Sequence, residues 1–444
     1  MKRTKLLAGT LTILAVAWLV TPIIHSVRRL CPVRPTGVTE AQATSQFSRR
    51  YNVDCRVCHA GFPRLTSFGE KFKMNGYQMP GGAGGDETAT KVSDRLVVPK
   101  LGDVFGLRIA LTPFAYAKSG LTKNGGKAAS SSIGRGNWLQ VFTAGPIYKN
   151  VSIFIETELQ NDKLHNNWMY LGFHNLAGPE GYLNARVGNL PAMDWHTISG
   201  RLRANPPLKY SITSDFKSAA GATGNEDQLG IGSANAGVEV YGYAGPLVYS
   251  AVVQDGKQQT ASGVDKNQDK NFAGTLGLRM PDGDLEGSQV SVFGLRAVDT
   301  KTTSTTQFRD TLKVVSPGLQ VRYKDFDFQS AFLYAEDDNW DLTNKYLKVV
   351  TRGIAASAGR FLSDAWFAHL QWDWLESPDV GRLFDKGTTT THVNKHFLSP
   401  SIWWFPRENL RWGLTVKYDM ETTANTAKHG YKNHEVFSTI RAMF

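Results

Sequence analysis

The stretch WFAHLQWDW, residues 366–374, alternates strictly between two kinds of side chain. One parity carries only apolar residues, namely Trp366, Ala368, Leu370, Trp372 and Trp374. The other parity is mixed and includes His369, Gln371 and Asp373. A period of two with one apolar face predicts a β-strand, because successive side chains of a strand point to opposite sides.

The same alternation recurs along the chain from about residue 104 to Phe444. Residues 151–156 and 410–418 repeat it most clearly. Glycine, proline and short polar residues interrupt the runs at 145–146, 255–256, 281–283 and 406–409, and we expect turns there. The C-terminal three-quarters of the chain is therefore predicted to be all-β.

A water-soluble sandwich and a transmembrane barrel both have such strands, but three features favour the barrel. Trp and Tyr gather near the ends of the apolar parity, as in interfacial girdles. The opposite parity carries charges that suit a wet lumen, such as Glu156, Glu158, Arg296 and Asp373. The chain ends on Phe444, with apolar residues of the same parity before it, like the last strand of bacterial outer-membrane proteins. At about 20 to 24 residues per strand and connection, we expect roughly 14 to 16 strands, and most simply 16.

Composition excludes several other classes. The chain has 444 residues, a net charge of +11 and three cysteines, and 11% of its residues are aromatic. The chain lacks the repeated apolar runs of a helical membrane bundle. It is too rich in aromatic residues to be disordered throughout. Three cysteines are too few for disulfides to stabilise a chain of this length. Nearly half of the charge, +5, lies in the first 43 residues. The remaining +6 is modest and spread out, so we expect no nucleic-acid partner.

The N-terminus has the layout of an export signal. Lys2, Arg3 and Lys5 form a basic start, and residues 6–24 are uncharged. This pattern is typical of a secretory signal peptide, although the apolar run is also long enough for an inner-membrane anchor. We expect cleavage after Ala43, which would remove Cys31 and leave two thiols in the mature chain.

Those two thiols belong to the motif Cys55-Arg56-Val57-Cys58-His59. Two cysteines three positions apart can bind the two vinyl groups of one haem, and the adjacent imidazole can then ligate its iron. A zinc site would need further ligands, usually a second cysteine pair, and a thioredoxin-like dithiol would need a βαβ context. The motif therefore predicts one covalently attached haem c, with Cys55 and Cys58 as thioether carriers and His59 as an axial ligand.

The residues after the motif predict a short amphipathic helix. Leu65, Phe68 and Phe72 share one helical stripe, with Pro63 near its start and Gly76 just past its end. For the sixth position of the iron we consider Met79 or Met74, the nearest thioethers, with a more distant histidine or an open position as alternatives.

These signals give a domain plan with four parts. We expect an export segment over 1–43, a monohaem cytochrome segment over 44–80, a Gly-rich linker over 81–100 and a porin-like barrel over 101–444. A haem segment of this size cannot bury a sizeable core of its own. We therefore expect it to lie in the barrel lumen or at the periplasmic mouth, where the barrel wall would supply the missing burial.

With these motifs in place, the sequence resembles a known family, the fused monohaem cytochrome–porins of the outer membrane of iron-oxidising bacteria. The resemblance rests on the haem motif and on the residues that follow it, namely Pro63, Leu65, Phe68, Gly69, Phe72, Gly76 and Tyr77. It extends weakly to residues 145–158, where a turn leads into a strand that ends in acidic residues. It implies that the chain lies in the outer-membrane lipid, oxidises extracellular Fe(II) at its haem, and passes the electron to a periplasmic c-type cytochrome.

Electron transfer of this kind needs no acid–base or nucleophilic residues, and we identify none beyond the haem. If the protein is an enzyme, it is an Fe(II):cytochrome c oxidoreductase. Glu156 and Glu158 are candidates for an Fe(II) path, since Fe(II) accepts oxygen ligands, but they equally suit an ordinary polar pore lining. Two other functions remain open: a haem-plugged porin for solute transport or redox sensing, and export of electrons to an extracellular acceptor.

Overall fold

The computed structural model describes residues 46–60, 64–80, 90–93, 96–98, 100–119, 128–160, 163–199, 203, 205, 208–216, 218, 231–232, 234–256, 268–343, 345–377, 395–420 and 433–444. The expected export segment, its cleavage site and residues 81–89 of the expected linker lie outside these residues. Among the described helices, none combines the length and the apolar character needed to cross a membrane.

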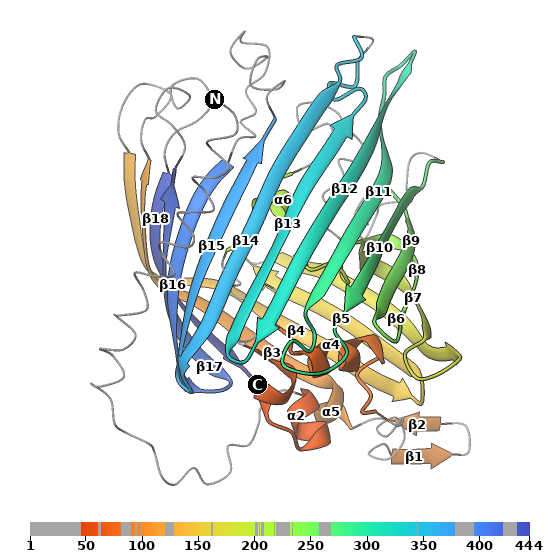
Figure 1. Ribbon diagram of the computed structural model, residues 1–444, viewed down its shortest axis with the longest axis vertical. Coiled ribbons are helices and arrows are strands. Elements are labelled where there is room, and N and C mark those ends of the chain that lie inside the picture. Colours follow the sequence, from red (N-terminus) through yellow and green to blue (C-terminus); the bar gives the residue numbers. More distant parts are fainter. Residues whose placement is uncertain are drawn as a thin grey trace. The chain divides into compact units, whose positions relative to one another are not determined.

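Within the described residues, sixteen antiparallel strands form one closed barrel (Figure 1). Each strand pairs with its neighbours in sequence, and β18 closes the barrel by pairing with β3. This confirms the predicted fold class and strand number. The strands are β3 (Phe105–Ser119), β4 (Ala128–Tyr148), β5 (Val151–Gln160), β6 (Lys163–Ala177), β7 (Leu183–Pro191), β8 (Ala234–Ala244), β9 (Leu247–Gln254), β10 (Asn271–Arg279), β11 (Gln289–Thr302), β12 (Gln307–Tyr323), β13 (Phe326–Asp337), β14 (Val349–Ser363), β15 (Trp366–Glu376), β16 (Lys395–Arg407), β17 (Leu410–Asp419) and β18 (Asn433–Met443).

The alternation in the sequence corresponds to the two faces of the barrel wall. On β15, the parity of Phe367, His369 and Asp373 is buried inside, while Trp366 is 43% exposed on the outside. Arg296 is an exception to the predicted lumen charges. It is exposed and shares the outward parity of β11 with Val292, while the inward residues on either side of it, Leu295 and Ala297, are apolar and buried.

Tryptophans form a row on the outer face near one end of the barrel. Trp366 pairs with Trp404, and Trp404 pairs with Trp412, on three adjacent strands. Their exposed fractions are 43%, 38% and 49%. Large apolar side chains from most other strands are also exposed on the outer face. Such a surface, with aromatic residues at its edge, is typical of a barrel that faces lipid.

Connections at the two ends of the barrel differ in length. Turns such as 149–150, 245–246, 324–325, 364–365 and 408–409 are two residues long and share one end with Phe444. Two predicted turns are displaced: Gly145 and Pro146 lie inside β4, and Pro406 lies inside β16. In both places the strand continues past the proline with an irregular register, and the reversal falls on the polar residues beyond it. The turns expected at 255–256 and 281–283 follow β9 and β10 directly.

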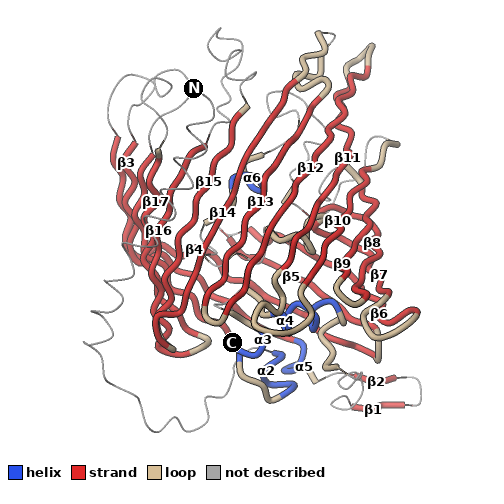
Figure 2. The backbone as a smooth tube through the Cα atoms, viewed as in Figure 1, coloured by secondary structure: helices blue, strands red, loops and turns tan. Residues whose placement is uncertain are grey.

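The N-terminal segment adds short helices at the end with the two-residue turns (Figure 2). They are α2 (Gln46–Tyr51), α3 (Cys55–Cys58), α4 (Ser67–Met74) and α5 (Leu101–Val104). Arg50 of α2 donates to the carbonyl of Pro146 at 3.1 Å, which joins α2 to the end of β4. The expected linker contains a two-stranded sheet, β1 (Thr90–Ser93) with β2 (Leu96–Val98).

The long connection between β7 and β8 folds into the barrel. Its helix α6 (Ser211–Ser214) contacts β14 and β15, and the Ser211 N–H donates to Asp373 at 2.8 Å (Figure 1). Ile198, Ile212 and other apolar residues of this connection pack against inward side chains of β11 to β15, such as Phe293 and Leu333. One side of the interior is therefore an apolar core rather than the wholly polar lumen that the sequence suggested.

Candidate functional site

The cysteine–histidine motif forms a single helical turn. Asp54 caps α3 by accepting from the Arg56 N–H at 2.7 Å, and the His59 N–H donates to the Cys55 carbonyl at 2.9 Å. This turn brings the two thiols to one side, three residues apart, with neither in a disulfide. His59 follows at the end of the turn and forms a β-bridge with Leu65.

Helix α4 packs directly on this turn and confirms the predicted short helix with Phe68 and Phe72, but it begins at Ser67, and Leu65 of the predicted stripe lies before it. Thr66 caps α4 by accepting from the Gly69 N–H at 3.0 Å, and its own hydroxyl donates to the Val57 carbonyl at 2.7 Å. A Cβ atom at Gly69 would overlap the carbonyl oxygen of Cys58. The glycine therefore permits the close approach of α4 to the motif.

The surroundings of the thiols fit a haem. Cys58 packs against an aromatic cluster that includes Phe72, Phe142, Phe154 and Tyr170. Burial raises the pKa of the Cys58 thiol to about 11, with Cys55 adding to the effect, and burial also raises the pKa of Cys55. Cys55 Sγ lies 3.8 Å from the Ser48 hydroxyl, and neither thiol is in a disulfide. Two such thiols, an adjacent imidazole and an apolar aromatic wall are the donor set and the environment that a covalent porphyrin needs.

The two candidate thioethers lie in different clusters. Met79 packs against the aromatic cluster that also contacts Cys58. Met74 is fully buried elsewhere, among Trp195, Tyr241 and Val248. The two methionines are therefore separated by the structure, and of the two only Met79 shares a cluster with the attachment motif.

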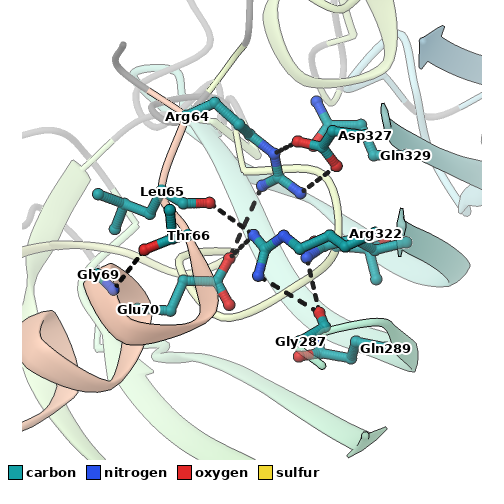
Figure 3. Close-up of polar contacts among 12 residues, drawn as sticks. Arg64, Leu65, Thr66, Gly69, Glu70, Gly287, Gln289, Arg322, Asp327 and Gln329 are labelled. Carbon is teal, nitrogen blue, oxygen red and sulfur yellow. Dashed lines mark hydrogen bonds and ion pairs between the residues drawn. The ribbon is translucent and has the colours of Figure 1, made fainter. Parts of the chain in front are cut away.

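Buried ion pairs fix the segment to the barrel wall (Figure 3). Arg64 pairs with Asp327 of β13 at 2.6 Å. Glu70 of α4 pairs with Arg322 of β12 at 2.7 Å and with Arg279 of β10 at 3.0 Å. Burial by itself would raise the pKa of Glu70, but the surrounding arginines outweigh it and lower the pKa to about 2. Glu70 is therefore ionised at neutral pH although it is buried.

A second set of charges joins α4 to the inward connection. Lys73 pairs with Asp194 at 2.6 Å, and Asp194 also accepts from Arg186 of β7 at 2.8 Å. Arg186 in turn pairs with Glu239 of β8. Between the two sets lies a small polar cavity of about 20 Å³; Glu70, Lys73, Asp194 and His196 are among its lining residues. We call residues 46–80, held in this way, the plug.

A third contact attaches the motif itself to a turn of the barrel. The Cys55 N–H donates to Glu408, in the turn between β16 and β17, at 3.2 Å. The Arg56 guanidinium pairs with the same carboxylate at 3.0 Å. Burial raises the pKa of Glu408 to about 7, assisted by the neighbouring Asp54.

The candidate Fe(II) residues are on the inward parity of β5, as predicted. Glu156 accepts from Gln140 at 2.6 Å and lies 3.7 Å from Arg108, and Glu158 also accepts from Gln140. Arg203, Arg411 and Arg441 add positive charge to the same region. In the part of the chain that the structure describes, no three His, Cys, Asp or Glu side chains gather in a way that could hold a metal ion.

Sequence reasoning missed the residues that hold the plug. Arg64, Glu70 and Lys73 look like solvated residues of a short helical segment. The partners of Arg64 and Glu70 on β10, β12 and β13 are more than 200 residues away, and Asp194, the partner of Lys73, is more than 100 residues away. The small size of the haem segment was the one indication in the sequence, because so short a segment must bury its apolar side chains against another part of the protein. It indicated that a contact with the barrel exists but not which residues make it.

Comparisons with known proteins identify the fold. No family model and no curated protein matches the chain. Among solved structures, the chain is similar to an anion-selective porin from Comamonas acidovorans, with 10% identity and a TM-score of 0.53, covering 77% of this chain and 99% of that one. It is also similar to OmpF from Salmonella typhi, in a complex with daunomycin, with 9% identity and a TM-score of 0.50, covering 77% and 97%. At this identity the likeness shows a porin-type barrel.

Proposed function

We propose that the chain is an outer-membrane electron-transfer protein that oxidises Fe(II) at one haem c and reduces a periplasmic c-type cytochrome. Cys55 and Cys58 would hold the haem, and His59 would ligate its iron. The observation that carries the proposal is the way the attachment motif is built into a porin-type barrel. Ion pairs of Arg64, Glu70 and Lys73 hold the helix next to the motif against the barrel, so the motif is not on a detached domain.

A bound haem supplies a one-electron couple. Overall, each Fe(II) loses one electron and becomes Fe(III), and one haem of the acceptor cytochrome gains that electron. No covalent bond of the substrate changes, so the protein needs no general acid or base. The tasks of this chain are to hold the two thioethers, to orient His59 through the α3 turn, and to keep water from the aromatic side of the site.

The outer face of the barrel supports a position in outer-membrane lipid. Its exposed apolar side chains and the row from Trp366 to Trp412 match a lipid-facing belt with an aromatic edge. In bacterial barrels the short turns face the periplasm. The plug, at the end with the two-residue turns, would then lie within reach of a periplasmic acceptor, and Fe(II) would enter from the side of the longer loops.

The test is rapid-mixing spectroscopy on the purified, haem-loaded protein. Addition of Fe(II) is expected to produce the reduced-haem spectrum, and a soluble c-type cytochrome added next is expected to take up the electron. His59→Ala should abolish the transfer, whereas His434→Ala on β18 should not. A haem that stays oxidised in excess Fe(II), or a His59→Ala protein that reduces the cytochrome at the wild-type rate, would refute the proposal.

A second function, passage of solutes through a haem-plugged porin, is favoured by the fold itself, since the comparisons are with porins. In liposomes such a protein would conduct ions at a rate that changes with the redox state of the haem. Conductance without Fe(II) oxidation would favour this function. If electrons instead leave the reduced haem for an extracellular acceptor and Fe(II) does not reduce it, the direction of flow is outward.

A further inference from the structure

His369 is a buried histidine for which the barrel provides no hydrogen bond. It points inward from β15 and is 4% exposed. Neither of its ring nitrogens has a hydrogen-bond partner among the described residues. An unsatisfied buried polar group costs about 1–3 kcal/mol, so such a group in a folded protein calls for a physical reason.

The other two buried histidines of the described residues do not share this property. His174 has Ser152 at 2.8 Å from Nε2 and Tyr241 at 3.4 Å from Nδ1. His196 has Ser291 at 2.9 Å from Nδ1 and Ser316 at 3.3 Å from Nε2. The interior of this barrel therefore satisfies buried imidazoles with hydroxyl groups, and His369 is the exception.

His369 lies at the level of the barrel where the plug is anchored. Along one row of strand pairs, Asp327 is opposite Gly359, Gly359 is opposite His369, and His369 is opposite Ser401. Strands are spaced by about 4.8 Å, so His369 is two strands, or roughly 10 Å, along the wall from Asp327. Asp327 is the residue that binds Arg64 of the plug.

Two contacts of the N-terminal segment flank this part of the wall. The motif is bound at Cys55 to Glu408, in the turn between β16 and β17. Arg64, five residues after the motif, is bound to Asp327 on β13. The strands between these two anchors are β14, β15 and β16, and His369 is on the inner face of the middle one. His59 lies between these two anchors in the sequence and pairs with Leu65, the neighbour of Arg64.

We propose that His369 is the second axial ligand of the haem iron, on the side opposite His59. The proposal rests on the haem attachment proposed above. A neutral imidazole with an uncommitted nitrogen is a common iron ligand, and coordination would satisfy the nitrogen that the barrel leaves without a partner. A barrel strand would thus complete a cofactor site that the N-terminal segment begins, and the iron would have two imidazole ligands rather than the Met/His pair that raises its potential.

The experiment compares the electron paramagnetic resonance and absorption spectra of four oxidised proteins: the wild type, His369→Ala, Met79→Leu and the control His434→Ala. Denaturing electrophoresis first checks that each protein carries covalent haem. We expect low-spin iron in the wild type, the control and Met79→Leu. We expect high-spin iron in His369→Ala, and added imidazole should restore its low-spin spectrum. That rescue separates loss of a ligand from general misfolding.

Three outcomes would overturn the proposal while leaving haem attachment intact: a high-spin wild type, a low-spin His369→Ala protein with an unchanged midpoint potential, or loss of the low-spin signal in Met79→Leu. A high-spin His369→Ala protein that imidazole does not rescue would also count against it. A wild type without covalent haem is a separate result, because it would refute the proposed function together with this inference.

Discussion

Replacing Glu70 by glutamine removes the carboxylate on which Arg64, Arg279 and Arg322 converge, while keeping the shape of the side chain. The pKa of Glu70 is lowered from 4.5 to about 2 by these arginines against the opposing effect of burial. At about 1.4 kcal/mol per pKa unit, the ionised carboxylate contributes roughly 3 kcal/mol to the association of the plug with the wall. Removing one partner of buried ion pairs typically costs about 3–5 kcal/mol, which agrees with this value.

Hydrogen exchange of α4, measured by mass spectrometry at neutral pH, would report this loss. A cost of roughly 3 kcal/mol corresponds to protection about a hundredfold lower in Glu70→Gln than in the wild type. The matched control is Glu286→Gln. It removes the exposed ion pair between Glu286 and Lys71 of α4, whose charged atoms are 3.6 Å apart. That pair is solvent-screened, so its loss should change protection by less than about 1 kcal/mol.

The pH dependence gives a second check on the same residue. Because the pKa of Glu70 is lower in the folded state, its contribution is complete above about pH 4.5 and is lost as the pH falls through about 2. After correction for intrinsic exchange rates, protection of α4 in the wild type should fall over this range, and in Glu70→Gln it should fall less. Equal protection in both proteins at neutral pH would refute the reasoning.

Three further substitutions have expected outcomes. Gly69→Ala should lower the yield of covalent haem, seen by haem staining, because its Cβ would overlap the carbonyl of Cys58, whereas Gly102→Ala, with no atom near its Cβ, should leave the yield unchanged. Thr66→Ala should reduce exchange protection of α4 by about 1 kcal/mol through loss of its N-cap, and wild-type protection would contradict this. Asp194→Ala leaves buried cations without their carboxylate and should cost about 3–5 kcal/mol in the same assay; a cost below 1 kcal/mol would show that water replaces the carboxylate.

Much of the barrel could be predicted from the sequence because strand alternation is a local signal. The parity of residues 366–374 alone separates the inner from the outer face of β15. Arg296 was misassigned because the middle of β11 has apolar residues on both parities. Its inward residues Phe293, Leu295 and Ala297 pack with the connection between β7 and β8. No periodicity within β11 indicates that a distant connection folds inward to cover it.

The candidate site also has local features that the sequence predicts and distant contacts that it does not. The Cys55–His59 motif is a local signal, and the apolar stripe predicted the helix that follows, although the helix begins only at Ser67. The partners of the plug were not readable, because Arg322 and Asp327 become its neighbours only when the barrel closes. In the sequence, His369 cannot be told from other lumen residues. Only the pairing of β13, β14 and β15 places it in the same row as Asp327.

The pairing of β18 with β3 joins the last described strand to the first strand of the barrel, so it is the seam that completes the barrel. The charged partners of Arg64 and Glu70 are on β10, β12 and β13, which are not strands of this seam. These ion pairs therefore do not depend directly on the pairing that closes the barrel, and a local opening of the seam would leave them in place.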